Sequence, residues 1–278
     1  MNSPTTPTLA IERSVPPGKL AIITGASSGI GKATALLLAQ RGFRTIVIAR
    51  RADLLGGLAT QLSAYAPSRA VPLDLSQPDR IMEVLGPVIA SEGTPSVLVN
   101  GAGFGLYAPY LEQSPEDIDL LVKVNFLAPA AIIRAVLPSM LKAAKGGEPA
   151  HIFNVCSVSA RLGPWGHAGY SAAKSALRSL TETLECEHGQ HGVHFTVVYP
   201  GIIKTEFFVG EQMKALWSKV ARRAIPPERV ARAIVRTLGK RRISLYVPAH
   251  YRGLDLIAAI SPNFALKMVR DESRPSRN

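Results

Sequence analysis

Two residues four positions apart, Tyr170 and Lys174, have side chains suited to moving a proton. At that spacing both lie on one face of a helix, which places the ammonium beside the phenol. A free tyrosine has a pKa of about 10, and a neighbouring cation stabilises the phenolate and lowers that pKa. Such a tyrosine can give a proton to a carbonyl oxygen or take one from an alcohol. The same spacing occurs by chance on many helices, so the pair needs support from other residues.

Ser157 and Asn125 supply polar groups of the kind that this chemistry needs. Ser157 follows a strand expected over residues 151–156, and its hydroxyl can hydrogen-bond to a substrate oxygen. Asn125 falls inside a helix expected over residues 114–137, where an amide is mildly unfavourable and therefore suggests a function. The alternative for Asn125 is a buried amide that is satisfied by nearby backbone. We take these two residues and the Tyr–Lys pair as the candidate catalytic set.

A glycine-rich segment, residues 24–31, joins the first expected strand to the first expected helix. Gly25 permits a tight turn, Gly29 lets the backbone approach a pyrophosphate, and Gly31 lets the helix pack close to the strand. The helix N-terminus then presents free N–H groups and a positive dipole end to the phosphates. The alternative is a structural turn without a ligand. We expect these residues of the turn to bind a dinucleotide: Gly25, Ser27, Ser28, Gly29, Ile30 and Gly31.

The second expected strand ends at Ala49 and is followed by Arg50 and Arg51 rather than by a carboxylate. NAD-preferring proteins place an acidic residue about here to hold the ribose hydroxyls. Arginines can pair with a 2′-phosphate, and the missing carboxylate removes a repulsion against it. The sequence therefore favours NADP(H) over NAD(H), unless the arginines merely begin an exposed helix. Asp74, after the third expected strand, can accept from the adenine amino group or belong to an ordinary turn.

Short apolar runs alternate with longer helical patterns along most of the chain. The runs predict strands over residues 20–24, 45–49, 70–73, 97–100, 151–156, 194–199 and 243–247. Apolar positions at helical spacing predict helices over residues 31–40, 51–62, 78–91, 114–137, 170–187 and 227–238. This alternation implies a single α/β domain whose parallel sheet is covered by helices on both faces. We expect the following division: a flexible leader at residues 1–18, a catalytic domain at 19–250 and a basic, apolar extension at 251–278.

Taken together, these motifs resemble the short-chain dehydrogenase/reductase family. The resemblance runs from about residue 20 to residue 247 and also includes an Asn-Gly-Ala-Gly run at residues 100–103 and a Tyr-Pro-Gly run at residues 199–201. It implies a Rossmann fold with a doubly wound, mostly parallel seven-stranded sheet. The sequence departs from the family at Gly101, where a second asparagine is common.

The resemblance implies a role for each residue of the candidate catalytic set. Tyr170 would be the acid and base, Lys174 would lower its pKa and bind the nicotinamide ribose, and Ser157 would polarise the carbonyl. Asn125 would hold a water molecule that relays protons from Lys174.

The resemblance also assigns cofactor contacts beyond the glycine-rich turn. The adenosine end would meet Ser27, Arg50 and Asp74, with Arg51 beside them. Asn100 would stabilise the central strand next to the cofactor. The remaining contacts fall on Ala102, Gly103, Tyr170, Lys174, Pro200, Gly201, Ile203 and Thr205.

The expected activity is NADP(H)-dependent reduction of a ketone or aldehyde to an alcohol, or the reverse. Apolar residues between the motifs favour a hydrophobic or lipid-like substrate, although each of them fits core packing equally well. These residues are Phe104, Leu106, Leu162, Trp165, Phe207, Phe208, Val209, Met213, Leu216 and Trp217. The family also implies a homodimer or homotetramer. The main alternative is a non-catalytic NADP-binding regulator on the same fold, against which the complete catalytic set argues.

The net charge of +12 leaves nucleic acid, an anionic membrane and an anionic cofactor as candidate partners. No nucleic-acid-binding signature accompanies the charge, so we expect no nucleic-acid partner. The two cysteines, Cys156 and Cys186, imply no disulfide framework, and we expect a cytoplasmic protein with Cys156 in its core. Three histidines lie in a glycine-interrupted turn, His188, His191 and His194, which favours a solvated loop over a metal site.

The last part of the chain is basic and then apolar. Between residues 219 and 252 the basic residues far outnumber the acidic ones, and residues 251–270 hold an apolar segment that Pro262 interrupts. This combination makes peripheral docking on the inner, anionic surface of a membrane, without a spanning helix, the slightly less favoured of two interpretations. The alternative is a segment that packs on its own domain or on a partner subunit.

Overall fold

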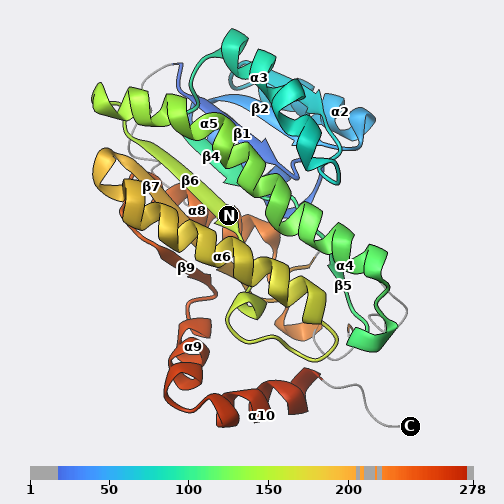
Figure 1. Ribbon diagram of the computed structural model, residues 1–278. Coiled ribbons are helices and arrows are strands. Elements are labelled where there is room, and N and C mark those ends of the chain that lie inside the picture. Colours follow the sequence, from blue (N-terminus) through green and yellow to red (C-terminus); the bar gives the residue numbers. More distant parts are fainter. Residues whose placement is uncertain (1–17, 205–206, 210–216, 218–220, 274–278) are drawn as a thin grey trace, which may run out of the picture.

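The computed structural model describes residues 18–204, 207–209, 217 and 221–273, and Figure 1 shows the path of the chain. A seven-stranded sheet forms its centre, and each pair of neighbouring strands is parallel. The strand order is β3-β2-β1-β4-β6-β7-β9, so the chain winds outward from β1 first in one direction and then in the other. The predicted doubly wound sheet is confirmed, and in this sheet no strand is antiparallel.

Each strand of the sheet lies within about two residues of its predicted position, because most of them are runs rich in apolar residues bounded by turn residues. The strands are β1 (Leu20–Thr24), β2 (Arg44–Ala49), β3 (Ser68–Pro72), β4 (Val97–Asn100), β6 (Ala150–Val155), β7 (Val193–Pro200) and β9 (Ser244–Val247). Alternate residues of β1 enter opposite layers of the core: Ile23 packs on one face of the sheet and Ile22 on the other.

Helices cover both faces of the sheet (Figure 1). One layer consists of α1 (Gly29–Ala39), α2 (Ala52–Ser63) and α8 (Pro227–Thr237). The other consists of α3 (Ile81–Glu92), α5 (Ala128–Lys145) and α6 (Ala168–His188). The strands end and the next helices begin at one edge of the sheet, which is where a doubly wound fold binds its ligand.

The helix predicted over residues 114–137 begins where expected, but it continues to Lys145 and is not uniform. It begins as α4 (Pro115–Val122), where the Ser114 side chain accepts a hydrogen bond from the Asp117 N–H in a capping box. A five-residue π-helical stretch, Lys123–Leu127, then joins α4 to α5. Such π-bulges are frequent at functional sites, and this one contains Asn125.

The continuous helical stretch Pro115–Lys145 is long and apolar enough to cross a bilayer by length and composition alone. Its apolar side chains face the sheet instead, since Ile132, Val136 and Met140 are fully buried there. We therefore describe it as a core helix of this domain.

Shorter elements complete the description. A small parallel pair that the sequence did not predict joins β5 (Gly105–Leu106) to β8 (Phe208–Val209). Two helices, α9 (Tyr251–Ile260) and α10 (Pro262–Ser273), follow β9, with the break at the predicted proline. The 3₁₀ turns are Pro78–Arg80, Tyr110–Glu112, Val158–Ala160, Gly189–His191 and Ala221–Arg223.

Candidate active site

The glycine-rich turn connects β1 to α1 through backbone that only small residues allow. Gly25 and Gly29 have positive φ angles of 67° and 55°. A Cβ on Gly31 would overlap the carbonyl oxygen of Gly25, so the helix starts against the turn itself. Because α1 begins at Gly29, with Ser28 as its N-cap, the first N–H groups of the helix have no partner within the helix. The turn thus has the geometry of a phosphate-binding helix N-terminus.

Thr24, which the sequence reasoning did not single out, joins this turn to the loop after β4. Its Oγ1 accepts hydrogen bonds from the N–H groups of Gly101 and Ala102, both at 3.1 Å. A Cβ on Gly101 would lie only 2.8 Å from the Thr24 carbonyl oxygen. This backbone therefore has no room for a side chain at position 101, where the family commonly has a second asparagine. The sequence feature that could have indicated this role is the polar side chain of Thr24 at the end of a buried strand.

The adenosine end of the candidate site contains the two arginines after β2. Arg51 donates from Nη2 to the Ser27 Oγ at 3.1 Å, and Arg50 is exposed beside it. Asp74 accepts a hydrogen bond from the Ser76 N–H at 3.0 Å, which is the ordinary turn that the sequence left open. A carboxylate has a second oxygen, so this turn does not exhaust its capacity to accept.

The nicotinamide end is built around Lys174 and Tyr170 of α6, both buried. Lys174 donates from Nζ to the Val155 carbonyl oxygen at 2.9 Å, and its Nζ lies 5.9 Å from the Tyr170 ring centroid. Burial lowers the pKa of Lys174 to about 8. Burial raises the pKa of Tyr170, and a hydrogen bond with Ser157 acts in the opposite direction. Among the groups of the chain itself, burial thus outweighs the lowering of the tyrosine pKa that the Tyr–Lys spacing predicted.

Ser157 lies two residues after the end of β6 and caps the 3₁₀ turn Val158–Ala160. Its Oγ accepts from the Ser159 N–H at 3.1 Å and lies 3.1 Å from the Ser159 Oγ, while it also shares a hydrogen bond with Tyr170. These contacts fix the hydroxyl at the carboxyl edge of the sheet next to the phenol. The neighbouring Cys156 is buried in the core, as predicted, and burial raises the pKa of its thiol to about 12.

Asn125 is held by backbone on one side of its amide only. Its Nδ2 donates to the carbonyl oxygens of Phe104 and Leu121, both at 3.0 Å, as the buried-amide alternative required. Its Oδ1 is buried and has no hydrogen-bond partner among the described residues. A Cβ on Gly103 would lie 2.7 Å from that oxygen and 3.2 Å from the Lys174 Nζ, so the two polar atoms flank Gly103. The free acceptor suits the predicted proton relay beside Lys174.

A buried chain of hydrogen bonds supports the central strands behind this site. Asn100 donates from Nδ2 to the Asn154 Oδ1 at 2.8 Å, and Asn154 donates to the Thr181 Oγ1 at 2.8 Å. This hydrogen bond joins β4 to β6, which is the place where Asn100 was expected to stabilise the central strand. Asn154 and Thr181 were missed, although an asparagine inside an apolar strand is a recognisable signal.

The last predicted cofactor contacts follow β7, which ends at Pro200. The Gly201 N–H donates to the Val247 carbonyl oxygen at 2.9 Å, and the Tyr251 ring packs so closely on Gly201 that a Cβ there would overlap it. Ile203 forms a bridge to Ile225 beside this loop. Thr205 lies outside the described residues.

Aromatic rings extend from Tyr170 toward the predicted substrate side. The Tyr170 ring centroid lies 5.8 Å from that of Phe207 and 6.1 Å from that of His167. Tyr107 continues the series, with its centroid 5.1 Å from that of His167 and 5.5 Å from that of Trp165. Met213 and Leu216, which the sequence also proposed as apolar lining, lie outside the described residues.

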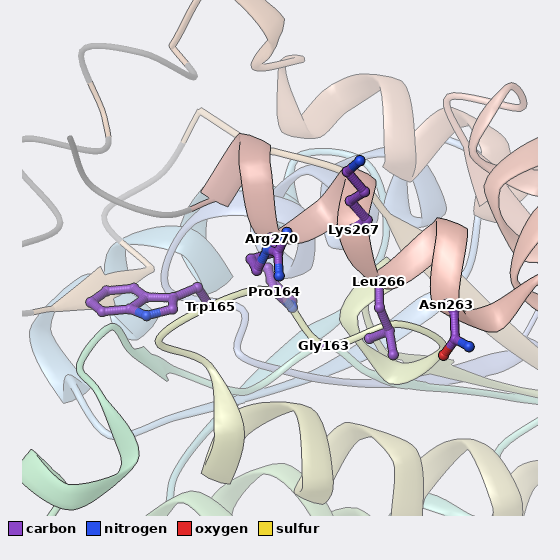
Figure 2. A pocket seen from close by; sticks show the side chains of 7 residues that line it. All are labelled: Gly163, Pro164, Trp165, Asn263, Leu266, Lys267 and Arg270. Carbon is purple, nitrogen blue, oxygen red and sulfur yellow. The ribbon is translucent and has the colours of Figure 1, made fainter. Parts of the chain in front are cut away.

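An open groove of about 410 Å³ lies at the outer end of this aromatic series. Figure 2 shows Leu266 extending from α10 toward the loop that contains Gly163. The residues that line the groove are Gly163, Pro164, Trp165, Asn263, Leu266, Lys267 and Arg270. Helix α10 therefore forms one wall of a depression whose other wall is the loop between Ser157 and Tyr170.

The residues described above fit a nicotinamide dinucleotide along the carboxyl edge of the sheet. The helix N-terminus at Gly29 suits the phosphates, and the arginines after β2 suit the adenosine end. The buried Oδ1 of Asn125 and the Nζ of Lys174 lie together at the opposite end, where the phenol of Tyr170 is also placed.

Comparison with known proteins agrees with this geometry. A family model for short chain dehydrogenases matches residues 19–215. An uncharacterized oxidoreductase of Staphylococcus epidermidis is 34% identical over 192 residues, which are 69% of this chain and 81% of that protein. A dehydrogenase/reductase SDR family protein 7-like of Drosophila melanogaster is 33% identical over 196 residues, which are 68% of this chain and 59% of that protein.

Two solved structures share the architecture. A metagenomic short-chain oxidoreductase in complex with NADP is 29% identical, with a TM-score of 0.69, and the match covers 83% of this chain and 97% of that one. A short chain dehydrogenase/reductase from Burkholderia phymatum in complex with NAD is 24% identical, with a TM-score of 0.79, covering 94% and 99% of the two chains. The second likeness shows the fold alone.

Proposed function

The chain belongs to the short-chain dehydrogenase family and is an oxidoreductase of that family, and we propose that it uses NADP(H) to interconvert a carbonyl compound and an alcohol, with Tyr170 as acid and base. The observation that carries this proposal is the buried grouping of the Tyr170 phenol, the Ser157 hydroxyl, the Lys174 ammonium and the Asn125 amide oxygen. A structural core has no need to bury these four polar groups together.

In the direction of reduction, the bound nicotinamide supplies a hydride to the carbonyl carbon. Tyr170 gives its proton to the carbonyl oxygen, and the Ser157 hydroxyl hydrogen-bonds to the same oxygen. The Lys174 ammonium stabilises the phenolate that forms. Because burial raises the pKa of Tyr170, the phenol is protonated at neutral pH and is ready to act as the acid. The Asn125 Oδ1 beside Lys174 can hold the donor that returns the proton.

Preference for the phosphorylated cofactor is supported by the two arginines after β2. Arg50 is exposed at the end of the strand, and Arg51 reaches the turn through Ser27. No carboxylate occupies position 49, 50 or 51 to repel a 2′-phosphate. The relative whose structure is complexed with NADP supports the same preference.

An apolar carbonyl compound is the substrate class that suits the outer part of the site. The rings of Phe207, His167 and Tyr107 lead from Tyr170 toward the groove beside α10. Trp165 and Leu266 line that groove, and an apolar lining of this kind favours ligands with a large apolar surface. We propose in addition a homodimer or homotetramer in the cytoplasm, as the family resemblance implies, and light scattering of the purified protein tests the oligomeric state.

The test of the catalytic proposal is Tyr170→Phe, assayed by NADPH oxidation with a panel of apolar ketones and aldehydes. We expect kcat to fall by at least about 100-fold, because only the proton donor is removed. The Kd for NADPH should stay within about 2-fold of the original value, since the ring remains. Tyr65→Phe, on an exposed tyrosine after α2, is the matched control. Tight NADPH binding by the unaltered protein without turnover of any carbonyl would favour the regulator instead.

The test of cofactor preference is Arg50→Ala. We expect the Kd for NADPH to rise by about 10- to 100-fold, because charge-assisted hydrogen bonds to the 2′-phosphate are lost. The Kd for NADH should change little, since NADH has no such phosphate. Arg134→Ala, on an exposed arginine of α5, controls for the loss of one positive charge. Equal weakening of both cofactors would make Arg50 a structural residue.

A further inference from the structure

The two C-terminal helices expose an unusual amount of apolar side chain. Five large apolar residues are exposed within this short segment, namely Leu256, Ile260, Phe264, Leu266 and Met268. Ile260, at the end of α9, is 85% exposed, and Phe264, in the first turn of α10, is 55% exposed. Single exposed apolar residues are ordinary, but a contiguous group of them on a surface marks an interaction site. We call α9 and α10 together the C-terminal hairpin.

The hairpin is fixed to the body of the protein on its other side. The Tyr251 ring packs on Gly201, and Asp255 accepts from the Tyr246 hydroxyl at 2.6 Å and pairs with Arg161 at 3.4 Å. Ala265 is fully buried. The exposed apolar face is therefore held in place by inward contacts made through other side chains of the same helices.

The far end of the hairpin is fixed as well. The Ser273 Oγ accepts from the Trp165 N–H at 2.9 Å, and the Ser273 carbonyl oxygen accepts from the Tyr107 hydroxyl at 2.9 Å. Figure 1 shows α9 and α10 as the outermost helices beyond the end of β9. The hairpin is thus a projecting element, anchored at both ends, with Leu256, Ile260, Phe264 and Met268 exposed on it and Leu266 lining the groove.

Two candidates for covering this surface are a second copy of the chain and a lipid bilayer, and the charge of the hairpin favours the bilayer. The exposed charged side chains that the structure describes on α9 and α10 are Arg252, Lys267 and Arg270, and the side chains of Asp271 and Glu272 in the last turn of α10 lie outside the description. The described acidic side chain, Asp255, is turned inward to Tyr246 and Arg161. A second copy placed symmetrically on the hairpin would bring the same cations against these. An apolar surface with a basic border complements an anionic lipid surface.

We propose that the C-terminal hairpin docks on the surface of an anionic lipid bilayer. Ile260 and Phe264, at the corner between the helices, enter the headgroup layer, and Arg252 and Lys267 lie over anionic headgroups. No spanning segment is involved. The groove between α10 and the loop at Gly163 opens beside the docked surface, so an apolar carbonyl substrate, if the proposed function holds, would have a short path from the bilayer.

The experiment is co-sedimentation with vesicles of phosphatidylcholine, with and without about a third of phosphatidylserine. We expect binding to the anionic vesicles at low salt, weaker binding at high salt and little binding to phosphatidylcholine alone, because screening weakens the basic contribution. A protein of net charge +12 can also adhere to anionic vesicles without a defined surface. A pair of charge-matched variants therefore carries the test.

The test variant is Ile260→Asp with Phe264→Asp, and the control is Leu54→Asp with Met82→Asp. Both double variants replace two exposed apolar residues by aspartate, and the control residues lie on α2 and α3, away from the hairpin. We expect vesicle affinity to fall at least 10-fold more in the hairpin variant than in the control, with the thermal midpoint and NADPH binding unchanged in both.

Equal loss of vesicle binding in the two double variants would overturn the proposal, because adhesion would then follow net charge alone. Absence of binding to anionic vesicles at low salt would also overturn it. A dimer in solution that dissociates in the hairpin variant, without vesicle binding, would assign the surface to a second copy. None of these readouts depends on turnover, so failure of the proposed reaction would leave this test intact.

Discussion

The interior of the sheet and the C-terminal hairpin differ in which side chains they bury. The sheet buries polar groups, whereas the hairpin exposes large apolar ones. Inside the sheet, buried polar groups are joined in hydrogen-bonded chains such as Asn100–Asn154–Thr181, and glycines meet backbone so closely that no Cβ fits. On the hairpin, large apolar side chains face outward, and a few polar contacts anchor the helices.

This difference has a consequence for how the two regions tolerate change. A single atom added or removed in the sheet interior leaves an overlap or an unpaired buried group, which costs on the order of 1–3 kcal/mol or more. A single change on the hairpin alters a partly solvated contact, which contributes about 1 kcal/mol or less. We therefore expect single substitutions to cause large losses of stability or binding in the sheet interior and small ones on the hairpin.

The largest effect is expected for Gly31→Ala. The new Cβ would overlap the Gly25 carbonyl oxygen, so α1 must move away from the phosphate-binding turn. We expect the Kd for NADPH to rise by at least about 100-fold, measured by fluorescence titration, because the helix N-terminus is displaced from the phosphates. Gly57→Ala is the control, since a Cβ there meets nothing within 4 Å and lies in the middle of α2. That variant should gain about 0.5–1 kcal/mol of stability. Unchanged NADPH binding by Gly31→Ala would show that the turn between β1 and α1 can accommodate a Cβ without displacing the helix.

The sequence predicted the sheet interior better than it predicted the details of the site. Most strands are buried runs rich in apolar residues, so local composition indicates where they lie, although β3 has a single buried residue. The turn at residues 24–31 is marked by glycines, two with positive φ angles and one, Gly31, with no room for a Cβ. The candidate catalytic residues could be found because Ser157 and Asn125 accompany the Tyr170–Lys174 pair and because a family shares the whole set.

The remaining features depend on contacts between distant segments. The π-helical stretch around Asn125 has no local signal, since it arises where the helix meets the Phe104 carbonyl oxygen and Lys174. The inward turn of Asp255 depends on Tyr246, and the close approach at Gly101 depends on Thr24. A linear pattern does not contain these pairings. Membrane docking of the hairpin stays a prediction.

A pH-dependent loss of stability is the second expected effect and belongs to the sheet interior. His151 on β6 is buried, with Nε2 at 2.8 Å from the Thr196 Oγ1 and Nδ1 at 3.3 Å from the Gly239 N–H. Thr196 donates its own proton to the Arg242 carbonyl oxygen, so the Nε2–H donates, Nδ1 accepts and the ring is neutral. Burial, with a contribution from His194, lowers the pKa of His151 to about 3.

The sign of the pH effect follows from that shift. Between the folded pKa of about 3 and the unfolded pKa of 6.5, the unfolded chain binds the extra proton, so stability falls as pH falls below 6.5. At about 1.4 kcal/mol per pKa unit, the contribution of His151 from pH 7 to pH 5 is on the order of 2 kcal/mol. Urea unfolding at the two pH values should show this loss in the unaltered protein and a smaller loss in His151→Gln. His188→Gln, at the last residue of α6, should keep the full loss, and an equally reduced loss in both variants would contradict the assignment to His151.

The smallest effect is expected at the anchor of the hairpin, for Asp255→Asn. Asp255 accepts from the Tyr246 hydroxyl and pairs with Arg161, and both charged side chains are about a quarter exposed, at 25% and 29%. Partly solvated pairs of this kind contribute about 1 kcal/mol or less, so the global free energy of unfolding should fall by no more than that. Hydrogen exchange is the sharper measurement, because a local anchor affects local opening. The amides of α9 should exchange faster, while those of β6 keep their protection. Asp119→Asn, which breaks an exposed pair with Lys123 on α4, is the control and should leave α9 unchanged. If the amides of β6 lose protection together with those of α9, the hairpin and the sheet open as one cooperative unit. Substitutions at the hairpin anchor would then destabilise the sheet as well, contrary to the difference between the two regions that we expect.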